Sequence, residues 1–156
     1  MRERVVQVVQ RVNFSKRYID LCNRFADFDN GAKFTKEEVK EIIAKLNGDL
    51  KFSSREKLFL KDYLFDEVNM RIILSYNYGF IDCTYAFWTD GYKERLNDSF
   101  FGISLLQDEE VESKVNYKFP IATSTIDLEE IVGEILRINK DVVHYFEKIT
   151  QASEEE

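Results

Sequence analysis

The sequence is poor in the residues that build disulfide, metal and redox sites. It contains one proline (Pro120), one histidine (His144) and two cysteines, Cys22 and Cys83. Two cysteines cannot form a disulfide framework, and a zinc site needs several His or Cys ligands at set spacing. No apolar run approaches the roughly 18 residues that span a bilayer, and residues 1–10 lack a signal-like cleavage site. We therefore expect no metal, no cofactor and no membrane insertion, and two reduced, buried thiols in a cytoplasmic protein.

The sequence patterns of common catalytic sites are also missing. There is no GxSxG, no HExxH and no glycine-rich phosphate loop. A dyad between His144 and either Cys22 or Cys83 is conceivable, because a nucleophile and its base need only meet in space. Cys83, however, falls in a predicted strand and not at a helix N-terminus, where a thiol is activated. We predict no catalytic residue and no enzymatic activity.

Length and charge bound the remaining possibilities. The chain has 156 residues, of which 44% are hydrophobic, and this favours one globular domain over residues 1–150. The net charge of −7 is uneven: residues 1–68 carry +2, residues 69–119 carry −3 and residues 120–156 carry −6. Phosphate binding relies on clustered Lys and Arg, so nucleic acid is disfavoured as a partner of the whole chain, although not of its first part.

Residues 69–119 are rich in aromatic and β-branched residues in short alternating runs, which predict an antiparallel sheet. The runs are 71–78, 80–88, 100–106 and 114–119, with a doubtful fifth over 92–96. Asn77 to Gly79 and Asp90-Gly91 are turn signals that favour hairpins. The short connections favour a meander, so the predicted fold class is α+β with four to five antiparallel strands between helical segments.

Helices are predicted on both sides of the sheet: 2–12, 15–25, 35–46 and 53–68 before it, as a helical segment over 1–68, and 124–149 after it. Thr35–Glu38 and Ser53–Glu56 have the pattern of a capping box, which starts a helix. The last helix carries an apolar stripe of period three and four that could be a lid over the sheet or a dimer seam, so the chain is a monomer or a homodimer. The lid is favoured because the stripe is wider than a strict seam. Residues 151–156 are predicted to be a disordered acidic tail.

Residues 27–38 form one acidic loop with a recognisable spacing. Acids stand at the first and third places, an apolar residue (Phe34) at the eighth and Glu38 at the twelfth. This stretch resembles the EF-hand calcium loop, which would imply a calcium site with Glu38 as the bidentate ligand. It departs from that pattern where Gly31 is fifth and Ala32 sixth, so the fifth ligand is lost. We expect a capped helix–loop–helix here.

Candidate interaction residues fall in two groups. Trp88, Asp90 and Tyr92 form a turn flanked by aromatic residues, which either anchors a partner or closes the end of the core. The second group is acidic and could form a negative patch that suits a basic partner, provided that its two clusters converge. It consists of Asp108, Glu109, Glu110 and Glu112 before the last predicted strand, and Glu130 and Glu134 on the last helix.

Three classes of function remain. The favoured one is a small acidic protein-binding module, an inhibitor or immunity-type protein that neutralises another protein by occupying it. The second is a nucleic-acid-binding regulator that uses the N-terminal helices, among which 35–46 and 53–68 could form a helix pair. The third is a small-ligand binder that uses a half-polar sheet face around Asp82, Thr84 and Ser104.

Overall fold

The chain folds into a five-stranded antiparallel sheet with helices before and after it. A computed structural model describes residues 1–155, and the side chains of residues 1–152. The sheet is a meander of order β1-β2-β3-β4-β5, which confirms the predicted α+β class. The elements are α1 (Arg2–Arg11), α2 (Phe14–Arg24), η1 (Phe28–Asn30), α3 (Lys36–Lys45), β1 (Lys51–Ser53), β2 (Leu58–Phe65), β3 (Val68–Asn77), β4 (Phe80–Thr89), η2 (Asp90–Tyr92), β5 (Arg95–Ser99), α4 (Phe100–Leu105), α5 (Val111–Lys114) and α6 (Thr125–Glu155).

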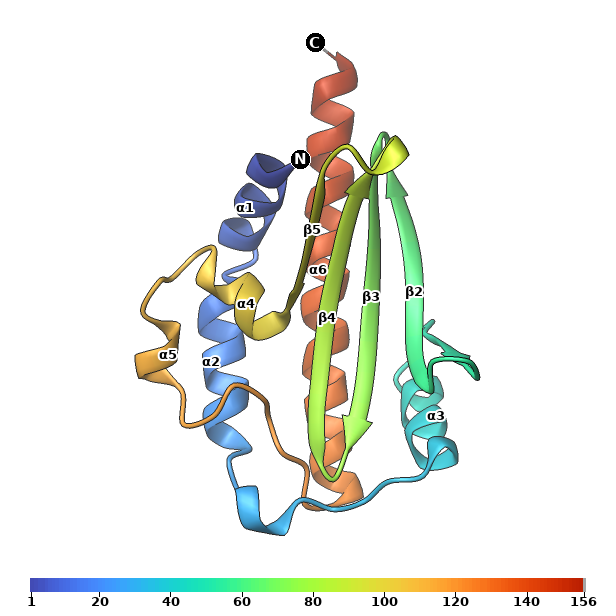
Figure 1. Ribbon diagram of the computed structural model, residues 1–156, viewed down its shortest axis with the longest axis vertical. Helices are drawn as coiled ribbons and strands as arrows, with labels where there is room; N and C mark the ends of the chain where they lie inside the picture. The colour runs from blue at the N-terminus through green and yellow to red at the C-terminus, as the bar shows by residue number, and fades with distance from the viewer. Residues whose placement is uncertain (156) are drawn as a thin grey trace.

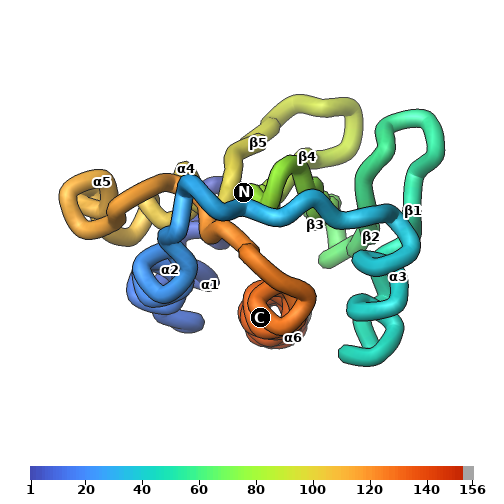
Figure 2. Tube along the Cα trace, turned by 90° about the horizontal axis from the view of Figure 1, so that it is seen from below, coloured from blue at the N-terminus to red at the C-terminus, as the bar shows by residue number. Residues whose placement is uncertain are grey.

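The long helices lie on one face of the sheet. Viewed end-on, α6 runs beneath the middle strands, α1 and α2 lie towards β5, and α3 lies towards β1 (Figure 2). The long axis of α6 follows the strands from one end of the sheet to the other (Figure 1). The opposite face of the sheet carries no helix in either view, so one layer of helices covers one side of one sheet.

Strand alternation builds the core beneath that helix layer. One side of β3 and β4 is at most 1% exposed: Met70, Ile72, Leu74, Ile81, Cys83, Tyr85 and Phe87. The stripe of α6 faces it and is at most 2% exposed: Leu128, Ile131, Ile135, Ile138 and Val142. The stripe is therefore a lid over the sheet of its own chain. Phe146 completes the contact, with its ring centroid 5.0 Å from that of Phe65 and 5.6 Å from that of Phe87.

The N-terminal helices dock onto this core. Val5, Val8 and Val9 of α1 are at most 3% exposed, and α1 contacts α6. The short helix α4 lies against β4 and β5, and α2 packs on α4. Both cysteines are free and buried. None of the helices in the described part of the chain is long and apolar enough to cross a membrane.

The segment 53–68, predicted as a helix, is a turn followed by β2. Ser53 Oγ does accept a hydrogen bond from the Glu56 amide at 3.4 Å, as a capping residue would. The chain then turns at Lys57, whose φ is 58°, and enters the sheet. A Ser hydroxyl makes this bond in a turn as readily as at a helix start, so the local pattern does not distinguish the two.

Two predicted strands near the end of the sheet are also wrong. Residues 100–106 contain α4, because Ser99 caps it by accepting from the Gly102 amide at 3.2 Å. Residues 114–119 form no strand, since their backbone bonds go to side chains of α2. The Lys114 carbonyl accepts from Asn23 Nδ2 at 2.8 Å, and the Lys118 carbonyl accepts from the Tyr18 hydroxyl.

Two smaller boundaries also differ from expectation. The doubtful fifth strand, expected over 92–96, lies later in the chain, as β5. The predicted tail at 151–156 continues α6 as far as Glu155, and Glu156 lies outside the described residues.

Candidate functional site

The uncovered face of the sheet is the main candidate for a functional surface. Register places its side chains in rows across the strands. One row joins Leu64, Asn69, Trp88 and Arg95, and the next joins Asp62, Arg71, Ala86 and Asn97. Both rows lie at the end of the sheet where β4 passes into η2 (Figure 1). This end combines aromatic, cationic and exposed apolar side chains.

Trp88 is the centre of this arrangement. Its ring stacks on Tyr92, with centroids 6.3 Å apart and planes 15° apart, and the Arg71 guanidinium lies 5.9 Å from its centroid. Arg95 lies 6.0 Å from the centroid of the Tyr92 ring. Together with Asp62 and Leu64 these residues form what we call the Trp88 surface. The flat groups are held in one stack, so they are ordered before any partner arrives.

Arg71 is oriented from the neighbouring strand. Its Nε and Nη2 donate to the two carboxylate oxygens of Asp62 at 2.6 and 2.9 Å, directly across the β2–β3 ladder. A two-point contact of this kind fixes the plane of the guanidinium. The ion pair is exposed, so it orients the Arg71 guanidinium but adds little to the stability of the fold.

The loop between β4 and β5 presents Tyr92. Gly91 and Tyr92 both have a positive φ, of 73° and 55°, and Thr89 Oγ1 accepts from the Glu94 amide at 3.0 Å to close the loop. The Glu94 carboxylate lies 3.2 Å from the N-terminal ammonium of Met1. This loop leaves Tyr92 63% exposed. The Asp90-Gly91 signal therefore indicates this connection correctly.

Exposed acids surround the Trp88 surface. The β2–β3 turn ends at the same end of the sheet as η2 (Figure 1) and carries Asp66 and Glu67. Asp90 is exposed in η2. Residues 62–71 and 88–99 hold six acidic and three basic residues, a net charge of −3. Of these acids, Asp98 falls on the covered side of β5, and Asp62 and Glu94 are paired with Arg71 and the Met1 ammonium. Asp66, Glu67 and Asp90 are the acids left beside the stacked groups.

Comparison with family models, with curated protein sequences and with solved structures gives no match. The function is therefore argued from the side chains themselves.

The two predicted acidic clusters do not converge. Asp108, Glu109, Glu110 and Glu112 lie before and within α5, whereas Glu130 and Glu134 lie on α6, with α2 between the two helices (Figure 2). Arginines of α2 meet the α6 acids: Arg24 lies 3.2 Å from Glu130, and Arg17 lies 3.2 Å from Glu134. Asp108 pairs with Lys114 at 2.7 Å. Some acids of each cluster therefore form ion pairs within the chain and are not available to a basic partner.

The loop that resembles an EF-hand is a capped junction. Thr35 Oγ1 accepts from the Glu38 amide at 3.2 Å, and Glu38 Oε1 accepts from the Thr35 amide at 3.1 Å. Asn30 Nδ2 donates to the Asp27 carboxylate at 3.0 and 3.1 Å. Nowhere in the described residues do three or more His, Cys, Asp or Glu side chains gather in a way that could hold a metal ion.

The cysteines and the histidine do not form a dyad. Burial raises the pKa of Cys22 to about 12 and that of Cys83 well above its ordinary value, so both thiols are neutral at physiological pH. His144 lies on the exposed side of α6. No hydrogen bond joins it to either thiol in the part of the chain that the structure describes.

The predicted half-polar ligand face is only partly assembled. Asp82 and Thr84 share the uncovered side of β4, but Ser104 is fully buried in α4 and donates to the Phe101 carbonyl. Burial raises the pKa of Asp82, although Lys118 counteracts this. Its Oδ1 is buried and has no hydrogen-bond partner among the described residues.

Sequence reasoning missed Asp62, Leu64, Arg71 and Arg95 as members of the site. For Asp62 and Leu64 the reason is the helix predicted over 53–68, which removes β2 from the sheet. The alternation of Phe59, Lys61, Tyr63 and Phe65 towards the covered face could have revealed this strand. The leucines on the opposite side obscure this alternation, because a segment that is apolar on both faces fits the period of a helix as well as that of a strand.

Proposed function

We propose that the protein is a binding module that docks a basic segment of another protein on the Trp88 surface. It acts by occupying that segment and so neutralising the other protein. The observation that carries this proposal is the ordered stack of Trp88, Tyr92 and Arg71 on a sheet face without a helix. Two buried free cysteines fit a reducing compartment, so we place this function in the cytoplasm.

The composition of the surface supports a protein partner. Trp, Tyr and Arg are the residues that most often dominate the energy of protein interfaces. Here all three occur within one stack, and Leu64, which is 65% exposed, adds an apolar contact beside them. Burying this group in an interface would remove a large apolar and aromatic area from water.

The surrounding charge supports a basic partner. Asp66, Glu67 and Asp90 are exposed around the stack, and the two segments that build it carry −3. Complementary charge of this kind speeds association and disfavours acidic competitors. A lysine- or arginine-rich segment is therefore the occupant that we propose.

The nucleic-acid alternative loses its suggested helix pair. The segments 35–46 and 53–68 do not form one, because the second contains β2. No specific observation favours this alternative.

The test is a comparison of matched variants in an affinity purification from the native cell, with and without nuclease. Trp88→Ala is expected to lose a basic protein that the wild type retains in stoichiometric amount. A truncated hot-spot residue costs about 2 kcal/mol or more, which corresponds to a roughly 30-fold weaker complex. The purified pair would then be measured by calorimetry.

The chain offers a closely matched control. Tyr78 and Tyr92 are 62% and 63% exposed and both have a positive φ, of 52° and 55°, but they lie at opposite ends of β4. Asparagine tolerates this backbone conformation, so Tyr92→Asn and Tyr78→Asn should fold alike. Only Tyr92→Asn should weaken the complex. A partner that Trp88→Ala and Tyr92→Asn retain at full affinity would refute the proposal.

A further inference from the structure

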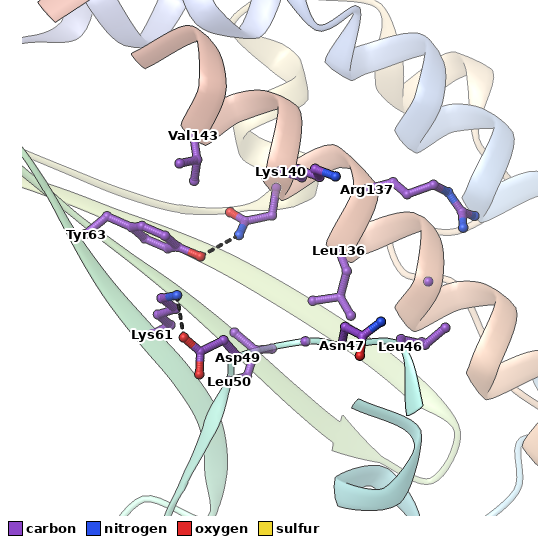
Figure 3. Close-up of a pocket in the computed structure, with 13 residues that line it drawn as sticks. Leu46, Asn47, Asp49, Leu50, Lys61, Tyr63, Leu136, Arg137, Lys140 and Val143 are labelled. Atoms are coloured by element: carbon purple, nitrogen blue, oxygen red, sulfur yellow. Dashed lines mark hydrogen bonds and ion pairs between the residues drawn. The ribbon is translucent and has the colours of Figure 1, made fainter. Parts of the chain in front are cut away.

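A groove lies on the helix side of the sheet, between α6, β2 and the loop from α3 to β1. Its volume is about 500 Å³, within the size range of small-molecule sites. Leu136 and Val143 of α6, which lie off the buried stripe, form its apolar wall with Leu50 (Figure 3). Tyr63, Lys61 and Lys140 line it as well. It is separate from the Trp88 surface, which lies on the other face of the sheet.

A buried hydrogen-bond chain leaves one donor free in this groove. Tyr85 is 1% exposed, and its hydroxyl donates to Asn139 Oδ1 at 2.8 Å. Asn139 Nδ2 in turn donates to the Tyr63 hydroxyl oxygen at 3.0 Å, the upper dashed line in Figure 3. The amide of Asn139, itself 5% exposed, has this orientation because the reverse would leave the Tyr85 proton without an acceptor. The Tyr63 oxygen already accepts a bond, so its own hydrogen is free to donate to a ligand.

The charged side chains around the groove also favour a ligand that accepts hydrogen bonds. Lys61, Arg137 and Lys140 line it, against a single acid, Asp49, which pairs with Lys61 at 2.6 Å. This gives +2 around the groove in a chain whose net charge is −7. Arg137 bonds Glu134 at 3.0 Å, whereas no ion pair joins Lys140 to any residue that the structure describes. The free cation and the free phenol hydrogen both favour an anion.

We propose that this groove binds a small organic anion, a carboxylate or a phosphate ester with a compact apolar body. The anionic head accepts from the Tyr63 hydroxyl and lies near the ammonium group of Lys61, while Lys140, directed away from Tyr63 (Figure 3), adds positive charge at the rim. The apolar body packs on Leu136, Leu50 and Val143. These donors beside an aliphatic wall favour an anion over a neutral amide or a cation.

The experiment is a titration of the isotope-labelled protein, followed by amide chemical shifts. The probes are 4-phenylbutyrate, phenyl phosphate and the neutral 4-phenylbutyramide. At least one anion is expected to give saturable shifts confined to residues 46–50, 61–63 and 133–143. The amide should bind about tenfold more weakly, because a hydrogen bond to a charged group is stronger than one to a neutral group. Saturable shifts outside these segments, equal binding of amide and acid, or no saturable binding of either anion would overturn the proposal.

Variants test which side chains bind the anionic head group of the ligand. Tyr63→Phe keeps the ring and removes the donor, and Lys140→Gln removes the unpaired cation; each should weaken the anion by about fivefold to tenfold. Lys16→Gln, an exposed cation on α2, is the matched control and should leave the affinity unchanged. Thermal unfolding of each variant identifies any loss of the fold. A folded Tyr63→Phe, Lys140→Gln double variant with wild-type affinity would refute the assignment.

Discussion

The two faces of one sheet differ in what covers them in this protein. On β4, Tyr85 and Phe87 point into the core and are 1% exposed, whereas Ala86 and Trp88, one residue away, lie on the uncovered face. The covered face meets α6 and α4 and holds the chain together. The uncovered face has no such duty, so its side chains can differ without loss of the fold. The comparison suggests that stability and recognition are divided between alternate residues of the same strands.

The strongest test of this division compares neighbouring residues of β4. Phe87→Ala should lower the free energy of unfolding by about 3–5 kcal/mol, because it leaves a cavity against Phe146 and Tyr85. Trp88→Ala should lower it by only about 1 kcal/mol, since its ring is only partly buried and no helix packs on it. Urea unfolding followed by circular dichroism measures both. Equal losses would show that the uncovered face also supports the fold.

A second test removes the buried hydrogen bond between Tyr85 on the covered face of the sheet and Asn139 of α6. Asn139→Leu leaves the buried Tyr85 hydroxyl without an acceptor and should lower the free energy of unfolding by about 1–3 kcal/mol. Adding Tyr85→Phe removes the orphaned hydroxyl and should restore part of that loss. A double variant less stable than the single one would contradict this account.

A third test concerns Asp82, the uncovered-face residue with an unpaired buried oxygen. Burial raises its pKa, so the folded state binds the proton more tightly than the unfolded state, and the carboxylate destabilises the fold above that pKa. Asp82→Asn should therefore raise the free energy of unfolding by about 1 kcal/mol at pH 7. The gain should vanish below the ordinary aspartate pKa of about 3.9. Urea unfolding at pH 7 and at a pH below the ordinary aspartate pKa tests this. A gain in the free energy of unfolding that is equal at the two pH values would point to another cause.

The smallest effect is expected for the ion pair that orients Arg71. Asp62→Asn should change the free energy of unfolding by less than about 1 kcal/mol, because its side chain is 50% exposed. The same variant should weaken the proposed complex if Arg71 must stay over Trp88. Unfolding and calorimetry on one preparation separate the two effects. A large loss of stability would mean that the pair is structural.

Much of the covered face could be predicted from sequence. The alternation in β3 and β4, the turn at Tyr78-Gly79 and the stripe of α6 are all as expected, because each follows from a period that burial imposes on a contiguous segment. The capping box of Thr35 and Glu38 is also confirmed, since its bonds span only three residues. These features depend on local spacing alone.

The errors occur where local patterns fit two structures. Ser53 makes the same side-chain bond in a turn as at a helix start, and Phe100 to Leu106 is too short and too apolar to reveal its period. The strand predicted at 114–119 fails because distant side chains, Asn23 and Tyr18, take its backbone bonds. No local pattern records a partner that lies some 90 to 100 residues away.

The candidate site shows the same limit. The sequence brings Trp88, Asp90 and Tyr92 together because they lie within five residues around one turn signal, whereas Arg71 and Asp62 reach Trp88 only through the register of three strands. The acidic clusters on α5 and α6 are alike in sequence, and only the position of α2 between them keeps them apart.

By itself the sequence determined the fold class, the buried faces of β3, β4 and α6, and the caps and turns that join them, because burial and short hydrogen bonds act within a few residues. The tertiary structure alone decided which face of the sheet stays open, that Trp88 meets Arg71, and that a groove forms beside Tyr63. Each of these depends on side chains brought together across the sheet or between elements, and such contacts follow from the packing of the whole chain.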